Sequence, residues 1–71
     1  MNGFDLKIMR IRAGLRQYEV AAKVDLTAPR LCEIEAGRRK ASDELLDRIA
    51  RAIERTMKAK QLLAALEKDI Q

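Results

Sequence analysis

The chain has 71 residues, with fifteen lysines and arginines against eleven aspartates and glutamates, one cysteine and no histidine. A chain of this length forms one small domain, and without histidine or a second cysteine we expect no metal site, no cofactor, no internal disulfide and no enzymatic activity. The sequence shows no apolar run near the roughly 18 residues of a membrane span and no signal peptide, so we expect a soluble, cytoplasmic protein without membrane partners.

The positive charge is concentrated in the first part of the chain. Residues 1–41 carry nine lysines and arginines against five acidic residues, whereas residues 42–71 carry six of each. This asymmetry predicts a half that binds a polyanion and a neutral half with another task. The only aromatic residues are Phe4 and Tyr18, which argues against single-stranded nucleic acid, whose bases stack on aromatic rings.

No stretch alternates like a β-strand, so the chain is predicted to be all-α. The first helix is expected from about Asp5 to Ala13, with Gly14 at its C-terminal cap. Its apolar residues are Phe4, Leu6, Ile8, Met9 and Ile11. A second helix is expected from about Gln17 to Val24, and the short "VDLT" that follows is a tight turn.

The stretch "TAPRLCEIEAG", Thr27 to Gly37, is predicted to be a short third helix. The Thr27 hydroxyl is placed to accept from the Arg30 amide, and Pro29 falls in the first turn, where a missing N–H is tolerated. Leu31 and Ile34 share the inward face, and Gly37 ends the helix.

A basic "RRK" loop follows, and Ser42 is expected to cap the next helix. Residues 43–71 contain no glycine or proline. They carry one apolar stripe from Leu45 to Met57 and a second, not quite continuous stripe at Ala59, Leu62, Leu63, Leu66 and Ile70. One long helix and two helices with a bend near Thr56 are both compatible with this pattern.

Two short helices joined by a three- or four-residue turn have the spacing of a helix-turn-helix motif. Over "QYEVAAKVDLTAPRLCEIEAGRRK" the chain resembles the phage repressor and Cro type (XRE-like) of helix-turn-helix DNA-binding proteins. The matching positions are the glutamine at the start of the second helix, the small residue at Ala21, the Ile-Glu-x-Gly ending, and an arginine at position 10. The resemblance covers residues 5–54 and implies an all-α, four- to five-helix repressor-type helix-turn-helix domain with an extended C-terminal helix.

Three residues depart from the family pattern. Asp25 stands in the turn where glycine is usual, Arg16 replaces the frequent Ser or Thr cap of the second helix, and Pro29 is less usual at a base-facing position. Aspartate tolerates the left-handed conformation better than most residues, so the expected consequence at Asp25 is strain of about 1 kcal/mol rather than another fold.

The resemblance also implies roles for individual residues. The third helix would enter the major groove and read bases through Thr27, Ala28, Pro29, Arg30 and Glu33. Phosphates would be bound by Arg16, Gln17, Tyr18, Arg38, Arg39 and Lys40. Arg10 and Glu35 would form a structural ion pair.

Each of these roles has a simpler alternative. Arg30 and Glu33 are also spaced as a surface ion pair, and "RRK" is also compatible with a solvated loop. Tyr18 suits packing as well as a phosphate contact. For Cys32, packing is favoured over redox sensing, because no second thiol is present.

We therefore expect residues 1–54 to form a helix-turn-helix DNA-binding domain and residues 55–71 to form a C-terminal helical segment that dimerises through Ala59, Leu62, Leu63, Leu66 and Ile70. The predicted function is that of a sequence-specific, double-stranded-DNA-binding transcriptional regulator. By resemblance it is a dimeric repressor from a phage, plasmid or mobile element, or a restriction–modification controller. The alternative is an antitoxin or adaptor whose main partner is another protein, bound through the C-terminal helix.

Overall fold

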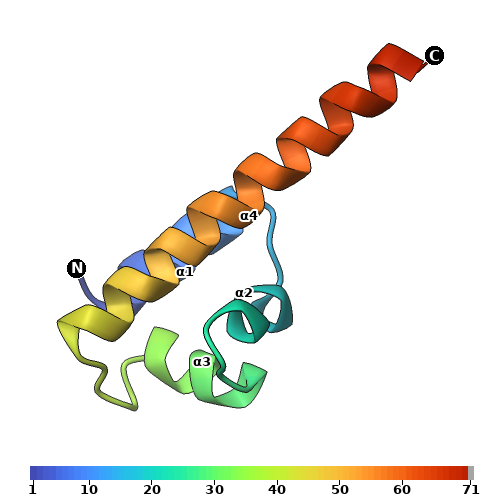
Figure 1. Ribbon diagram of the computed structural model, residues 1–71. Coiled ribbons are helices and arrows are strands. Elements are labelled where there is room, and N and C mark those ends of the chain that lie inside the picture. The colour runs from blue at the N-terminus through green and yellow to red at the C-terminus, as the bar shows by residue number, and fades with distance from the viewer. Residues whose placement is uncertain (71) are drawn as a thin grey trace.

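The computed structural model describes the backbone of residues 1–70 and the side chains of residues 1–68. This part of the chain forms four helices and no strand (Figure 1). They are α1 (Gly3–Arg12), α2 (Gln17–Lys23), α3 (Ala28–Glu35) and α4 (Asp43–Ile70). The all-α prediction is confirmed, and the C-terminal half is one continuous helix rather than two.

Helix α1 begins two residues earlier than the sequence pattern indicated. Asn2 is its N-cap and forms a capping box with Asp5: each backbone N–H donates to the other side chain at 3.0 Å. Gly3 then lies directly against the end of α3, where a Cβ atom would collide with the carbonyl oxygen of Ile34. The glycine therefore permits the close approach of α1 and α3.

Three residues in the turns have backbone dihedral angles in the left-handed region, with positive φ. Gly14 and Gly37 have φ values of +72° and +78° after the ends of α1 and α3. Asp25, in the turn between α2 and α3, has φ of +58° and is the non-glycine residue with positive φ in the described chain. The turn keeps the geometry expected for the motif although aspartate replaces glycine, at the modest conformational cost of that residue.

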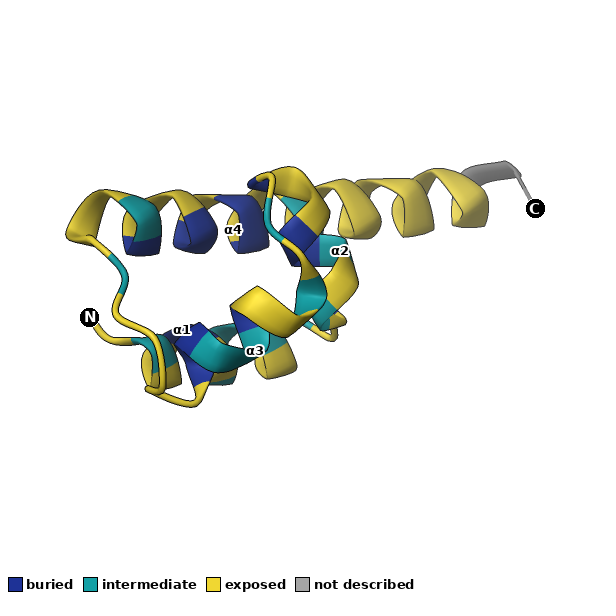
Figure 2. Cartoon of the chain, turned by 90° about the horizontal axis from the view of Figure 1, so that it is seen from below, coloured by how far each residue is buried: buried dark blue, intermediate teal, exposed yellow. Residues whose placement is uncertain are grey.

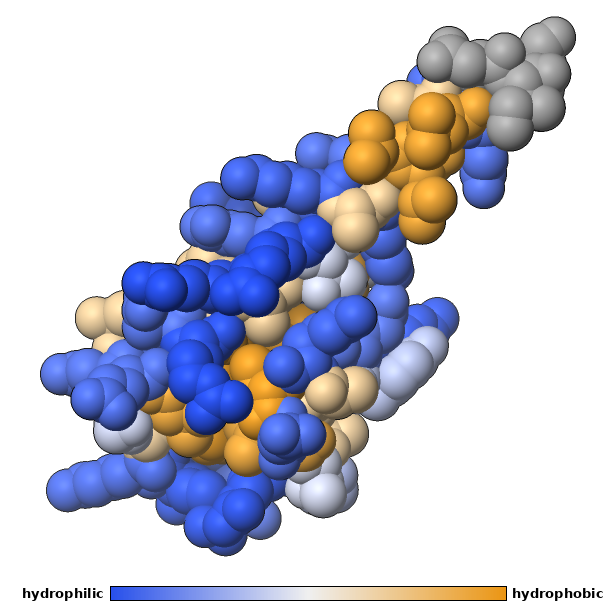
Figure 3. Space-filling view, viewed as in Figure 1, coloured by the Kyte–Doolittle hydropathy of each residue, from blue (hydrophilic) through white to orange (hydrophobic). Residues whose placement is uncertain are grey.

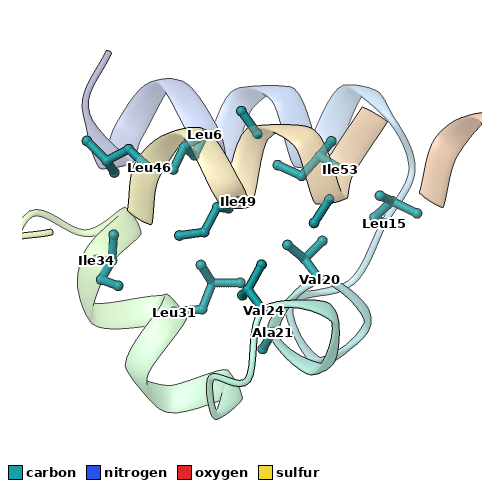
Figure 4. Close-up of a cluster of buried hydrophobic side chains, with 12 residues drawn as sticks. Leu6, Leu15, Val20, Ala21, Val24, Leu31, Ile34, Leu46, Ile49 and Ile53 are labelled. Atoms are coloured by element: carbon teal, nitrogen blue, oxygen red, sulfur yellow. The ribbon is translucent and has the colours of Figure 1, made fainter. Parts of the chain in front are cut away.

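The core lies between two pairs of helices. Helices α1 and α4 form one side, and α2 and α3 form the other (Figure 4). Its buried apolar residues are Leu6, Leu15, Val20, Ala21, Val24, Leu31, Ile34, Leu46, Ile49, Ala50, Ala52 and Ile53.

Helix α1 contributes less to this core than its composition suggested. Phe4 and Ile11 are exposed by 59% and 54%, and Leu6 is the buried residue of this helix. Leu15, in the loop after α1, is buried instead. The apolar residues of α1 lie around more than half of its circumference, so only one part of them can face the core.

Helix α4 packs on the core with its first half and extends away from it with its second. Thr56, where a bend was conceivable, donates its hydroxyl to the Ala52 carbonyl oxygen at 2.7 Å, and the helix continues unbroken. Residues 58–68 are all exposed (Figure 2). The radius of gyration is 13.2 Å, against about 11 Å expected for a compact domain of this length. The difference reflects a projecting helical arm of about 16 Å.

Candidate nucleic-acid interface

The start of α3 is fixed by its cap and its buried face. The Arg30 backbone N–H donates to the Thr27 hydroxyl at 3.2 Å, and Pro29 lies in the first turn. Leu31 and Ile34 are buried in the core. The opposite side of α3 is consequently held toward solvent, which is the orientation that a recognition helix requires.

A hollow of about 310 Å³ lies on this exposed side. It is lined by Asp25, Thr27, Pro29, Arg30, Glu33 and Arg39. Four of the five residues expected to read bases are therefore brought together on one surface. The fifth, Ala28, is half-buried and lies outside the lining.

Glu33 pairs with Arg39 rather than with Arg30. The Arg39 Nε donates to Glu33 Oε2 at 2.9 Å, with both side chains nearly half exposed. This hydrogen bond, together with the charges of Arg39, Arg38 and Arg30, holds the pKa of the Glu33 carboxyl below its ordinary value of 4.5. The pair links α3 to the loop after it. Glu33, which is expected to read bases, thereby orients Arg39, which is expected to bind a phosphate. No local pattern in the sequence indicates this pair.

Arg10 and Glu35 form a second, buried ion pair. Arg10 Nε and Nη2 donate to the two carboxylate oxygens of Glu35 at 2.8 and 3.1 Å, and their side chains are only 11% and 2% exposed. Arg10 Nη1 also donates to the Leu15 carbonyl oxygen at 2.9 Å. The guanidinium thus connects α1, the loop before α2 and the end of α3.

Gln17 joins this network. It was expected to bind phosphate, but its side-chain Nε2 donates to Glu35 Oε1 at 2.9 Å, and the residue is half-buried. The start of α2 is thereby fixed to the end of α3. A glutamine NH₂ group has two hydrogens, so one donor remains after this bond.

The other residues expected at phosphates lie on the surface. Arg16, Arg38, Arg39 and Lys40 are exposed, as is Tyr18, by 63%. The exposure of Tyr18 disfavours the packing role. The missing hydroxyl cap at Arg16 is offset by Glu19, whose carboxylate accepts from the Arg16 backbone N–H at 3.0 Å. Cys32 is a half-buried free thiol.

The residues expected to dimerise lie on the projecting arm. Ala59, Leu62, Leu63 and Leu66 are exposed, the three leucines by 63%, 59% and 50%. The side chain of Ile70 lies outside the described residues. Orange apolar side chains are grouped toward this end of the molecule in Figure 3.

An additional ion pair joins the base of the arm to the body. Lys60 Nζ lies 2.6 Å from Glu19 Oε2, and this contact lowers the pKa of the Glu19 carboxyl. The two residues are 41 positions apart, so sequence reasoning did not find the pair.

Within the described residues, no helix is both long and apolar enough to cross a membrane, and no group of three or more potential ligands is placed to hold a metal.

A helix-turn-helix family model matches residues 6–58, about three quarters of the chain. Together with the packed α2–turn–α3 unit, this match shows that the chain belongs to the XRE-type helix-turn-helix family. The protein is a DNA-binding transcriptional regulator of that type, and the family is a regulatory rather than an enzymatic one. No curated protein and no solved structure gives a significant match to the chain.

Proposed function

We propose that this protein is a sequence-specific repressor that binds duplex DNA in the cytoplasm as a homodimer, one α3 helix in each of two successive major grooves. The observation that carries the proposal is the solvent-facing hollow at the start of α3, where Thr27, Pro29, Arg30 and Glu33 meet. A dimer bound in this way at an operator would occupy promoter DNA. A phage, plasmid or mobile-element repressor or a restriction–modification controller acts in the same manner.

The chemistry of the hollow suits the edges of base pairs. Arg30 offers a bidentate donor to guanine O6 and N7, and Glu33 offers an acceptor to cytosine N4. The Glu33–Arg39 bond uses Oε2, which leaves Oε1 as the acceptor for a base. Thr27, Ala28 and Pro29 would approach the same bases, with the Ala28 methyl suited to a thymine methyl group.

The phosphate contacts would surround this hollow. Arg38, Arg39 and Lys40 form a run of three cations directly after α3, and Arg16 and Tyr18 are exposed at the start of α2. Gln17 would donate its second amide hydrogen to a phosphate while Glu35 holds the first. Such contacts fix the position of the protein on the duplex without reading its sequence.

Selection of bound duplexes from a random pool tests the proposal directly. We expect the full chain to enrich a two-fold symmetric site whose half-sites are about 34 Å apart. Enrichment of an asymmetric site of one half only would contradict the dimer. Retention of all duplexes equally would contradict sequence-specific binding.

The projecting arm supports the dimer. It carries Leu62, Leu63 and Leu66 in solvent, on about three helical turns whose residues are all exposed in the monomer. An isolated helical segment of this length is marginal in water, so burial of the leucines against a second copy would stabilise it. We therefore place the dimer interface on Ala59, Leu62, Leu63, Leu66 and Ile70.

The double variant Leu63→Asp/Leu66→Asp should give a folded monomer, because both side chains lie outside the core. Its affinity for the selected operator should collapse, while weak non-specific binding to DNA persists. Sedimentation equilibrium and circular dichroism measure the two parts of this prediction.

Two other outcomes are informative. A variant that stays dimeric would place the interface elsewhere, and the exposed Phe4 and Ile11 on α1 are the next candidates. If the wild-type chain is monomeric and the arm captures a different protein, the antitoxin or adaptor function would replace the dimeric repressor.

A further inference from the structure

A second hollow lies on a different part of the molecule from the recognition surface. It is a groove of about 610 Å³ between the end of α2 and the middle of α4. It is lined by Lys23, Val24, Arg48, Arg51, Ala52, Arg55, Thr56, Ala59, Lys60 and Leu63. None of these residues lines the hollow on α3.

The floor of the groove has the pattern of a helix-packing surface. Ala52, Thr56, Ala59 and Leu63 follow one another along α4 at spacings of four, three and four residues, which is the spacing of an a/d seam. Three of the four are small, so the backbone of another helix can approach closely. Between Arg48 and Leu63 the lining extends along about 22 Å of α4, which suits a helix of about four turns rather than a compact small molecule.

The walls of the groove are cationic. Five of its ten lining residues are lysine or arginine, and no lining residue is acidic. Two of the cations have acidic neighbours outside the lining: Arg51 Nε lies 3.0 Å from Asp47 Oδ2, and Lys60 pairs with Glu19. In Figure 3, blue side chains over α4 lie beside apolar ones between α4 and the body.

A second copy of the chain fits this groove poorly. If two α4 helices paired over residues 48–60, Arg48, Arg51 and Arg55 of each copy would face the cations of the other, and like charges at a helix interface are destabilising. Residues 62–68 lack this excess, since they contain Glu67 beside Lys68. The cationic part of α4 before the arm therefore suits an oppositely charged partner, whereas residues 62–68 suit self-association, and the two surfaces meet at Ala59 and Leu63.

We propose that the groove is a docking site for an acidic amphipathic α-helix of another protein. The apolar face of that helix packs on Val24, Ala52 and Thr56, and its flanking carboxylates pair with Arg48, Arg51 and Arg55 on one side and Lys23 on the other. Binding of this kind uses the helix-in-groove mode of peptide recognition. Docking of this kind is independent of which DNA sequence the protein reads.

The test uses the full chain and a designed, fluorescently labelled helical peptide of about 18 residues, with leucines at heptad a and d positions and glutamates beside them. Fluorescence anisotropy should show binding in the micromolar range. Arg51→Glu/Arg55→Glu should weaken binding by at least about tenfold, because two wall charges are reversed. Lys7→Glu/Arg12→Glu, on exposed positions of α1, changes the net charge equally and should leave binding unchanged.

A third variant separates apolar docking from simple charge attraction. Thr56→Lys adds a cation but obstructs the floor at a position outside the proposed dimer interface, so it should weaken binding of the peptide. Tighter binding to this variant would contradict the proposal, as would equal binding of a peptide with the same composition and its leucines scattered around the helix.

Three further outcomes would overturn the proposal. If the peptide fails to bind wild-type protein, or if Arg38→Glu/Arg39→Glu abolishes binding while the groove variants do not, the groove is not the docking site. If sodium dodecanoate binds in the groove and the helical peptide does not, the site takes a small anionic amphiphile and the helix proposal is overturned.

Discussion

Two glutamates of the same short helix form ion pairs in opposite surroundings. Glu35 is 2% exposed at its side chain and receives three hydrogen bonds from Arg10 and Gln17. Glu33, two residues earlier, is 43% exposed at its side chain and receives one, from Arg39. The buried pair holds three segments of the chain together, whereas the exposed pair lies in the hollow proposed to read DNA. Burial, more than the chemistry of the pair, distinguishes the structural pair from the pair proposed to take part in recognition.

The largest expected effect comes from breaking the buried pair. Glu35→Ala leaves the Arg10 guanidinium buried without its carboxylate, at an expected cost of about 3–5 kcal/mol in the free energy of unfolding. Urea denaturation followed by circular dichroism measures this loss, and a chain this small is expected to be largely unfolded by it.

Glu33→Ala is the matched control, since it removes a carboxylate from the same helix but from an exposed pair. It should leave the free energy of unfolding little changed. A loss at Glu35→Ala below about 1 kcal/mol, equal to that at Glu33→Ala, would show that burial does not distinguish the two pairs.

The next largest effect concerns the hollow on α3, which Arg30 lines together with the Glu33–Arg39 pair. Arg30→Ala should cost about 1–3 kcal/mol on the selected operator and relax the preference at one base pair in each half-site. Binding titrations against the operator and against single-base variants measure both quantities. An equal loss on every sequence would assign Arg30 to phosphate rather than to base contact.

Arg39→Ala should affect DNA binding differently. Because Arg39 is expected at a phosphate, its loss should weaken operator and random DNA equally and reduce the slope of log K against log salt concentration by about one unit. Titrations at several salt concentrations provide the slope. A change confined to the operator would mean that Arg39 acts by orienting Glu33 toward a base.

Local signals in the sequence predicted the elements of the fold, because caps and turns act within a few residues. Thr27 and Ser42 cap α3 and α4 as expected, and Gly14 and Gly37 follow the ends of α1 and α3 in the left-handed conformation. Helix α1 begins before the expected Asp5 because Asn2 and Asp5 form a capping box at its N-terminus.

Contacts between distant residues were predictable only where the family resemblance supplied them. The Arg10–Glu35 pair was expected on that basis, and the structure contains it. The Glu33–Arg39 and Glu19–Lys60 pairs were not expected, since each depends on how a loop or an arm returns to the body. The groove between α2 and α4 was missed for the same reason: its walls come from separate helices.

The smallest effect is the most direct measure of the exposed pair. The hydrogen bond from Arg39 is the main cause of the lowered pKa of Glu33, and the charge of Arg30 is a lesser one. An NMR titration of the Glu33 carboxyl carbon should therefore find its pKa below 4.5 in the wild-type chain. Arg39→Ala should raise it toward that value, and Arg30→Ala should raise it less.

The lowered pKa of Glu33 also determines how the stability of the folded chain should depend on pH. Because folding lowers the pKa of Glu33, the pair stabilises the folded chain above pH 4.5, and this contribution disappears as the pH falls through the lowered value. The difference in unfolding free energy between wild type and Arg39→Ala should accordingly be present at neutral pH and vanish in strong acid. A difference that persists unchanged in acid would mean that Arg39 stabilises the loop through contacts other than the carboxylate.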